Sequence, residues 1–242
     1  MAAVETITTV LTAATATAPA GPYDLTDLAT AKDELNIPTS DTTSDAFLSR
    51  AITQVSAAIA NYCQRVFAVE TVQDMIWPER DNYPYQVPGG VAPLQLTRWP
   101  VCQVAWVSII DPPGTITILV QAPNVPTTQP PPLPGAFQAD LERGWLTRLD
   151  PYTGYPTSWN PVLTTAVYSA GYKTIPADLV DATLRLVTAR YAARGRDPLI
   201  MSQDQPGLGT QRFWVGGMPG VKGAFPQEIA ALLDLYRVPV TA

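Results

Sequence analysis

The side chains that could do chemistry in this 242-residue sequence are carboxylates, tyrosines and two thiols, because histidine is absent. Its absence removes the commonest general base, the commonest metal ligand and every Ser-His or Cys-His nucleophile pair. A carboxylate pair could still hydrolyse a glycoside. The acidic residues, however, stand at expected helix starts or in turns, where local backbone roles explain them: Asp27, Asp45, Asp178, Glu228, Asp81, Asp111 and Asp150. We therefore expect no catalytic residue and no enzymatic activity.

Cofactor and metal motifs are also missing from the sequence. Cys63 and Cys102 form neither a CxxC pair nor a zinc-ligand spacing, and we expect them to be buried free thiols. There is no GxxxxGK[ST] or GxGxxG motif, and the Gly207-Leu208-Gly209 stretch is not followed by a helix signal. The sequence therefore predicts no cofactor and no metal.

Charge and hydropathy limit the partners. Fifteen basic and 21 acidic residues give a formal charge of −6, which disfavours tight binding to a phosphate backbone. The same sign suits a surface past which DNA slides. No apolar run approaches the roughly 18 residues needed to span a bilayer, and the N-terminus lacks the pattern of a secretory signal. We expect no membrane association.

A cluster of aromatic residues allows another interpretation. Trp145, Tyr152, Tyr155 and Trp159 could stack sugar rings or bases. Because aromatic rings usually serve burial first, packing is the favoured interpretation. A tail-associated carbohydrate-binding protein remains an alternative function.

Four helices and a β-rich segment should position these residues. Hydrophobic periodicity and end signals predict helices over about 24–37, 44–62, 176–194 and 226–236. Between the second and third helices the period changes towards two, and strands are expected at about 68–76, 104–110, 115–120, 136–140, 145–149 and 163–169. Asp111 to Gly114 and Glu142 to Gly144 have hairpin-turn residue types. The predicted fold class is α+β, a small helical bundle of about four helices with a β-rich insertion.

Composition divides the chain further. Residues 1–22 are Ala/Thr-rich and nearly uncharged, and are expected to form an extended, flexible arm. The stretches 78–93 and 122–135 are proline-rich and are expected to be surface loops. The expected organisation is an arm (1–22), the first part of a helical core (23–66), the β-rich insertion (67–172), a central helix (173–195), a glycine-rich docking loop (196–225) and a C-terminal helix with its tail (226–242).

Two features suggest contact with other chains. The third helix carries two apolar stripes, so most of its circumference should avoid water, within a bundle or in a subunit interface. The 196–225 loop places Phe213 and Trp214 in a glycine-rich frame, and long loops of this kind are usually functional or disordered. With Tyr236 and Arg237 they are our candidates for partner contacts, because exposed aromatic residues and arginine are favoured interface anchors.

The order of these parts resembles the head-to-tail connector (adaptor) family of long-tailed bacteriophages and gene transfer agents. Four segments carry the resemblance, the third being the most specific: Leu25 to Ile37, Asp45 to Phe67, Val167 to Tyr172 with the following Ile175 to Tyr191, and Pro226 to Arg237. Together they cover a little under half of the chain. The arm, the insertion and Leu235, where a proline is common, depart from the family pattern.

The resemblance implies a structural virion protein, assembled in the host cytoplasm and located in the neck. Such adaptors form a ring, commonly of twelve subunits, that binds the portal on one side and the stopper or tail on the other. DNA passes through the ring without sequence-specific binding. Another neck component, a stopper or a tail terminator, is the nearest alternative.

Overall fold

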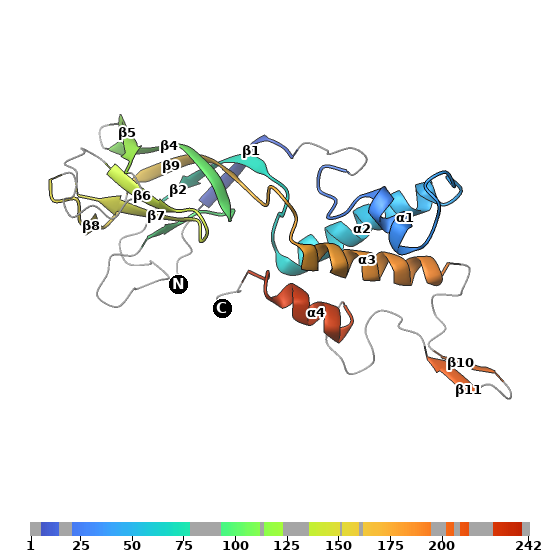
Figure 1. Ribbon diagram of the computed structural model, residues 1–242. Helices are drawn as coiled ribbons and strands as arrows, with labels where there is room; N and C mark the ends of the chain where they lie inside the picture. Colours follow the sequence, from blue (N-terminus) through green and yellow to red (C-terminus); the bar gives the residue numbers. More distant parts are fainter. Residues whose placement is uncertain are drawn as a thin grey trace. The chain divides into compact units, whose positions relative to one another are not determined.

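The protein is described from a computed structural model that covers residues 6–14, 21–77, 93–111, 114–122, 136–150, 152–159, 162–194, 202–205, 209–212 and 225–238 (Figure 1). The chain divides into two compact units, one formed by residues 1–14 and 68–173, the other by 15–67 and 174–242. The chain therefore passes between the units three times. Among the described helices, none has the length and apolar character needed to cross a membrane.

The first unit is a mixed nine-stranded sheet. Its strands are β1 (Thr6–Thr12), β2 (Glu70–Ile76), β3 (Leu94–Gln95), β4 (Val101–Asp111), β5 (Thr115–Gln121), β6 (Ala136–Asp140), β7 (Trp145–Leu149), β8 (Pro156–Thr157) and β9 (Leu163–Ala170). The order is β1-β2-β9-β4-β5-β6-β7-β3, with β8 also paired to β7. Only β5 and β6 pair in parallel. The two predicted hairpins are present, closed by the Asp111–Thr115 and Asp140–Trp145 pairs.

One apolar core serves most of this sheet. Alternate residues of β2 are buried, as expected for a strand with one face on the core. The cluster joins Val72 and Tyr168, near one end of the strand order, to Leu146 and Leu94, near the other. The sheet therefore folds over a shared interior instead of staying open.

The N-terminal residues correct an expectation. Thr6–Thr12 form an edge strand in register with β2 from Thr6–Ile76 to Val10–Val72, whereas their composition predicts a flexible arm. Six of the seven residues are exposed, so little side-chain burial orders them. The strand is instead held by the main-chain ladder and by Thr8, whose hydroxyl donates to the carboxylate of Asp74 at 2.8 Å.

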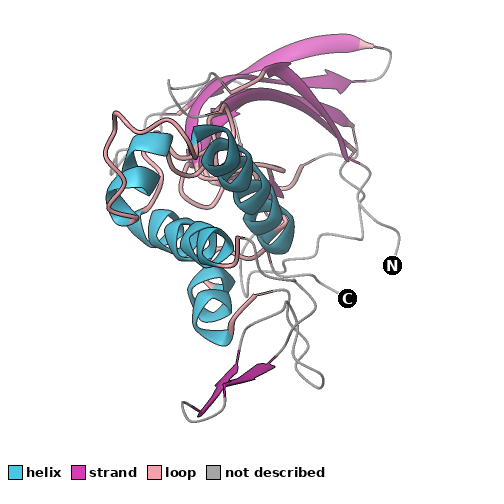
Figure 2. Ribbon diagram, turned by 90° about the vertical axis from the view of Figure 1, so that its right-hand side faces the viewer, coloured by secondary structure: helices cyan, strands magenta, loops and turns pink. Residues whose placement is uncertain are grey.

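The second unit contains the helices α1 (Leu28–Glu34), α2 (Asp45–Cys63), α3 (Ala177–Ala192) and α4 (Gln227–Asp234), and a hairpin of β10 (Ser202–Gln205) and β11 (Gly209–Arg212) (Figures 1 and 2). Helix α1 begins where the Asp27 side chain accepts a hydrogen bond from the amide of Thr30 at 2.7 Å. Helix α2 ends at Gln64, which adopts a left-handed conformation. Each helix lies inside the range that the sequence predicts, apart from one further residue of α2.

Helices α1, α2 and α4 all contact α3. Leu179, Ala182 and Leu186 of α3 are buried, while Val180 and Leu184 of its second apolar stripe are only half-buried. The described helical core also contains Leu48, Ile52, Val55, Ile59, Ile229 and Leu233. Each stripe is therefore mixed, because Ala189 of the first stripe is exposed and Val187 of the second is fully buried.

The α+β class and the four helices are confirmed in the described part of the chain, but the balance between the two structural types differs from the prediction. The sheet has nine strands and forms a unit of its own, so a small helical bundle with an insertion is not an adequate description. The sequence underestimates the sheet because β1 resembles a flexible arm, and because β3 and β8 have two residues each.

Candidate assembly surfaces of the helical unit

Tyr236, just after the C-terminal helix α4, forms hydrogen bonds with the central helix α3. Its hydroxyl lies 2.7 Å from both carboxylate oxygens of Asp178, in the first turn of α3. Its ring packs edge-on against Phe67, with 6.1 Å between ring centroids. Tyr236, one of our candidate partner contacts, is therefore half-buried and hydrogen-bonded within its own unit.

Arg237 is exposed on the same segment. Its guanidinium carbon lies 5.4 Å from the ring centroid of Tyr62, within the range of a cation–π contact. Tyr62 in turn donates a hydrogen bond of 2.8 Å to Asp234, and this bond raises the pKa of the tyrosine. The end of α4 thus holds one arginine where a partner could reach it.

The other two candidate partner contacts, Phe213 and Trp214, lie outside the described residues.

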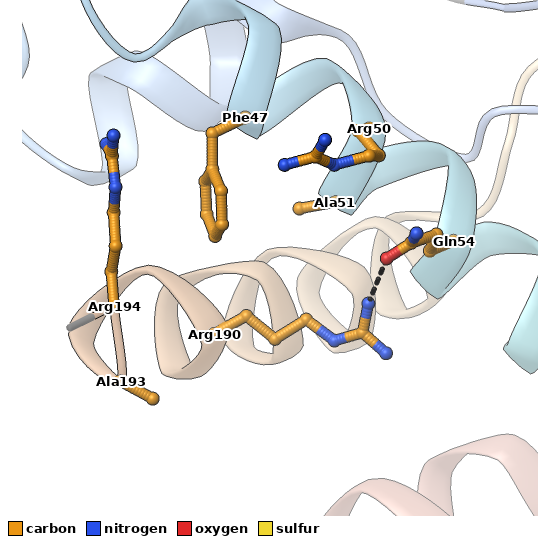
Figure 3. Close-up of a pocket in the computed structure, with 7 residues that line it drawn as sticks. All are labelled: Phe47, Arg50, Ala51, Gln54, Arg190, Ala193 and Arg194. Atoms are coloured by element: carbon orange, nitrogen blue, oxygen red, sulfur yellow. Dashed lines mark hydrogen bonds between the residues drawn. The ribbon is translucent and has the colours of Figure 1, made fainter. Parts of the chain in front are cut away.

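A second exposed feature of the helical unit is a hollow of about 290 Å³ lined by α2, α3 and the residues that follow α3. Three arginines surround it: Arg50 from α2, Arg190 from α3 and Arg194 just beyond α3 (Figure 3). Phe47 and Ala51 supply the apolar part of the lining. We name Arg50, Arg190 and Arg194 the arginine cluster.

The arginine cluster is held by neutral partners. Arg190 donates to the side-chain oxygen of Gln54 at 3.0 Å, and Arg194 donates to the hydroxyl of Ser44 at 3.2 Å. The guanidinium carbons of Arg194 and Arg50 lie 5.2 and 6.0 Å from the ring centroid of Phe47. None of the carboxylates that the structure describes forms an ion pair with these three arginines. Sequence reasoning missed this cluster, because Arg50 and Arg190 are 140 positions apart.

The buried carboxylate of the sheet unit has a structural role. Asp74 is fully buried and accepts hydrogen bonds from the Tyr168 hydroxyl (2.6 Å), the Thr97 amide (2.9 Å) and the Thr8 hydroxyl (2.8 Å). Burial, and then the charge of Asp74, raise the pKa of Tyr168 well above its ordinary value. The phenol therefore stays protonated and joins the strands β2 and β9 to the segment that follows β3.

The two cysteines are free thiols. Cys63 is fully buried at the end of α2, and burial raises its pKa to about 11. Cys102 is half-buried in β4, so the expectation of burial holds in full only for Cys63. Within the described residues, no group of three acidic or cysteine side chains is placed to hold a metal ion.

The aromatic cluster does not form one stacking platform. Trp159 belongs to the sheet core, where its indole nitrogen donates to the carbonyl of Leu146 at 3.2 Å. Trp145 is half-buried, and its indole nitrogen donates to the side chain of Gln95. Tyr152 and Tyr155 are exposed, at 89% and 70%, on the turn after β7. The packing interpretation therefore holds for Trp159 and in part for Trp145, whereas Tyr152 and Tyr155 are exposed.

The fold has a counterpart among solved structures, although no family model and no curated sequence matches the chain. One chain in the neck of an empty gene transfer agent (GTA) particle, computed with C6 symmetry, aligns with a TM-score of 0.50 and 17% identity, over 98% of this chain and 97% of that one. At this identity the likeness establishes a shared fold over nearly the full length of both chains.

Two other chains are more distant. A chain from the neck of the native GTA particle, computed with C12 symmetry, gives a TM-score of 0.46 and 15% identity, over 89% of this chain and 90% of that one. A chain from the native GTA virion gives 0.46 and 16%, over 98% and 97%.

Proposed function

We propose that this chain is a structural component of a virion neck, and specifically a head-to-tail adaptor of a tailed phage or gene transfer agent. The observation that carries the proposal is the shared fold with a GTA neck chain over 98% of the present chain. In this role the protein forms a ring between the portal and the stopper or tail, and DNA passes through the ring.

The positions of the four family-like segments support the same proposal. They fall on α1, α2, α3 with the preceding strand β9, and α4. These segments form the helical unit and one of the chain's passages between the two units. The departures from the family pattern fall mainly in the sheet unit, so the elements that resemble an adaptor are the ones that pack together.

The chemistry of the chain is consistent with a passive role. A chain of net charge −6 repels phosphate, so a channel built from it would not retain DNA. The absence of histidine and the structural role of Asp74 leave the described residues without an evident acid–base pair. We therefore propose a non-enzymatic protein.

Contacts with the portal or with neighbouring copies are assigned to Phe213, Trp214, Tyr236 and Arg237. Arg237 is exposed and can meet a partner directly. Tyr236 acts by fixing the segment that carries Arg237, because its hydroxyl and ring are engaged by Asp178 and Phe67. Twelve copies is the number that the family resemblance implies.

The test is reconstitution with the portal protein of the particle that contains this chain. The purified chain and portal are mixed, and complexes are examined by native mass spectrometry and electron microscopy. An adaptor binds the portal directly and forms a ring on it. A stopper or terminator would bind only after an adaptor is added, and that result would replace the adaptor assignment with another neck component.

A further inference from the structure

The arginine cluster is a concentration of positive charge in an acidic protein. Arg50, Arg190 and Arg194 are exposed around a hollow whose lining includes the ring of Phe47, and their described contacts are with neutral groups. Guanidinium groups bind carboxylates in paired hydrogen bonds, and charged hydrogen bonds of this kind are among the stronger ones. The arginine cluster can therefore bind carboxylates, and none of the described carboxylates of its own subunit pairs with it.

Carboxylates are gathered elsewhere on the same unit. Asp181 forms an ion pair with Arg185, with 2.9 Å between the nitrogen and oxygen atoms. Helices α1 and α4 both contact α3, and the charges of Glu228 and Glu34 act on Arg185 after that of Asp181 and raise its pKa. Glu34 and Glu228 are exposed at the end of α1 and the start of α4. This acidic cluster, Glu34, Asp181 and Glu228, exceeds its one arginine by two charges.

The α3 residues of the two clusters lie on opposite sides of the helix. Arg190 follows Asp181 by nine positions within α3. Nine residues correspond to about two and a half helical turns, which points the side chains in opposite directions. One rigid helix thus carries a basic side and an acidic side, and the two sides of one copy cannot neutralise each other.

We propose that these two sides form the contact between neighbouring copies, with the arginine cluster of one subunit receiving the acidic cluster of the next. This inference rests on the ring of the proposed function and deepens it. A ring requires a heterologous interface, in which one face of a subunit meets a different face of its neighbour. Opposite charges on opposite sides of α3 meet that requirement, and like sides of two copies repel, which disfavours a closed twofold dimer.

A second copy fits the cluster better than a nucleic acid does. A phosphate chain carries a dense row of negative charge and is repelled by a protein of net charge −6, whereas a second copy offers three carboxylates to the three arginines at a much lower charge density. Binding of an acidic oligonucleotide or peptide to the cluster is therefore expected to be weak compared with self-association.

The experiment is a charge reversal on each side, followed by mixing. The basic-side variant is Arg190→Glu/Arg194→Glu, and the acidic-side variant is Glu34→Lys/Glu228→Lys. The control is Arg143→Glu/Lys173→Glu, which makes the same change in net charge as the basic-side variant, at exposed positions of the sheet unit. Self-association is measured by sedimentation velocity across a range of concentration, alone and with portal present, and folding is checked by circular dichroism and thermal melting.

The proposal predicts that either variant alone associates at least tenfold more weakly than the wild type, while the control does not. An equimolar mixture of the two variants should recover association, because alternating copies again present opposite charges at each contact. The acidic-side variant gives the more decisive test. If net charge alone governed association, this less negative chain would associate more strongly than the wild type.

Two results would overturn the inference. In the first, the wild type forms rings and folded variants form them equally well, which leaves the adaptor role intact and places the contact elsewhere. In the second, the wild type shows no self-association at any concentration, with or without portal. The adaptor role itself is judged separately, by direct portal binding.

Discussion

The Tyr236 hydroxyl lies 2.7 Å from both carboxylate oxygens of Asp178, and so connects the segment after α4 to the first turn of α3. Asp178 has two roles at this point. As an acidic residue in the first turn it complements the dipole of α3, and as an acceptor it holds the end of the chain's last helix. This contact therefore adds to the packing of α4, whose Ile229 and Leu233 are buried in the same unit.

Replacing Tyr236 with phenylalanine should destabilise the helical unit by about 1.5–3 kcal/mol, the usual contribution of a hydrogen bond to a charged group. Urea unfolding, followed by far-ultraviolet circular dichroism, measures the change. Tyr155→Phe is the matched control, since Tyr155 is 70% exposed and should shift stability by less than about 0.5 kcal/mol. Equal effects of the two variants would show that the contact with Asp178 contributes nothing.

Asp74→Ala should cost the sheet unit about 3 kcal/mol or more, because it leaves the buried Tyr168 hydroxyl and the Thr97 amide without their acceptor. Hydrogen exchange of the β2 and β9 amides reports the loss. Exchange in β1 should accelerate as well, since Thr8 donates to the same carboxylate. The exposed Glu142→Ala is the comparison, and protection of β1 that survives Asp74→Ala would contradict this role.

Gly171→Ala should be strongly destabilising, by about 3 kcal/mol or more, because two separate costs add. Gly171 has a φ of 128°, and an added Cβ would lie 2.3 Å from the carbonyl oxygen of Ala68. Gly114→Ala isolates the cost of the positive φ, since Gly114 has a φ of 115° and no atom lies within 4 Å of the added Cβ. Thermal melting should therefore separate the two variants, and similar melting temperatures would refute the close approach.

Stability should fall at alkaline pH through Cys63. Burial raises the folded-state pKa of this thiol to about 11, whereas in the unfolded chain it ionises near its ordinary value. A raised folded pKa means that its contribution is complete below about pH 8.5 and is lost as pH rises towards 11, amounting to about 2–3 kcal/mol.

Urea unfolding of the wild type and of Cys63→Ala between pH 8 and pH 11 tests this. The difference between the two proteins removes the contribution of tyrosines that titrate in the same range. The wild type should lose more stability than the variant over this interval. Parallel curves would contradict the assignment, and so would rapid alkylation of Cys63 in the folded protein at pH 8.

The sequence predicts elements whose signals are local. Asp27 and Pro176 mark helix starts, and a change of period towards two marks the strand-rich segment, so four helices and six strands are placed within a few residues. Strand β1 is missed because its order comes from pairing with β2, whose Ile76 lies opposite Thr6 although the two are far apart in the chain. Composition alone describes the same residues as a flexible arm.

The candidate sites show the same limit. Asp74 looks like any acidic residue of a strand until the fold brings Thr8, Thr97 and Tyr168 to it. The sequence marks Arg190 and Arg194 as residues near a helix end, but only the packing of α2 on α3 places Arg50 beside them. The four-residue spacings from Arg50 to Gln54 in α2 and from Arg190 to Arg194 at the end of α3 are the signal that could have suggested it.

The most direct test is to locate this chain in the particle that contains it. A copy carrying an N-terminal affinity tag is expressed in the producing cells, and purified particles are labelled at the tag and imaged by electron microscopy. Label at the junction of head and tail, with a ring of this fold beneath the portal in the averaged density, is the predicted result. Label on the capsid shell, along the tail tube or at the tail tip would contradict the adaptor role.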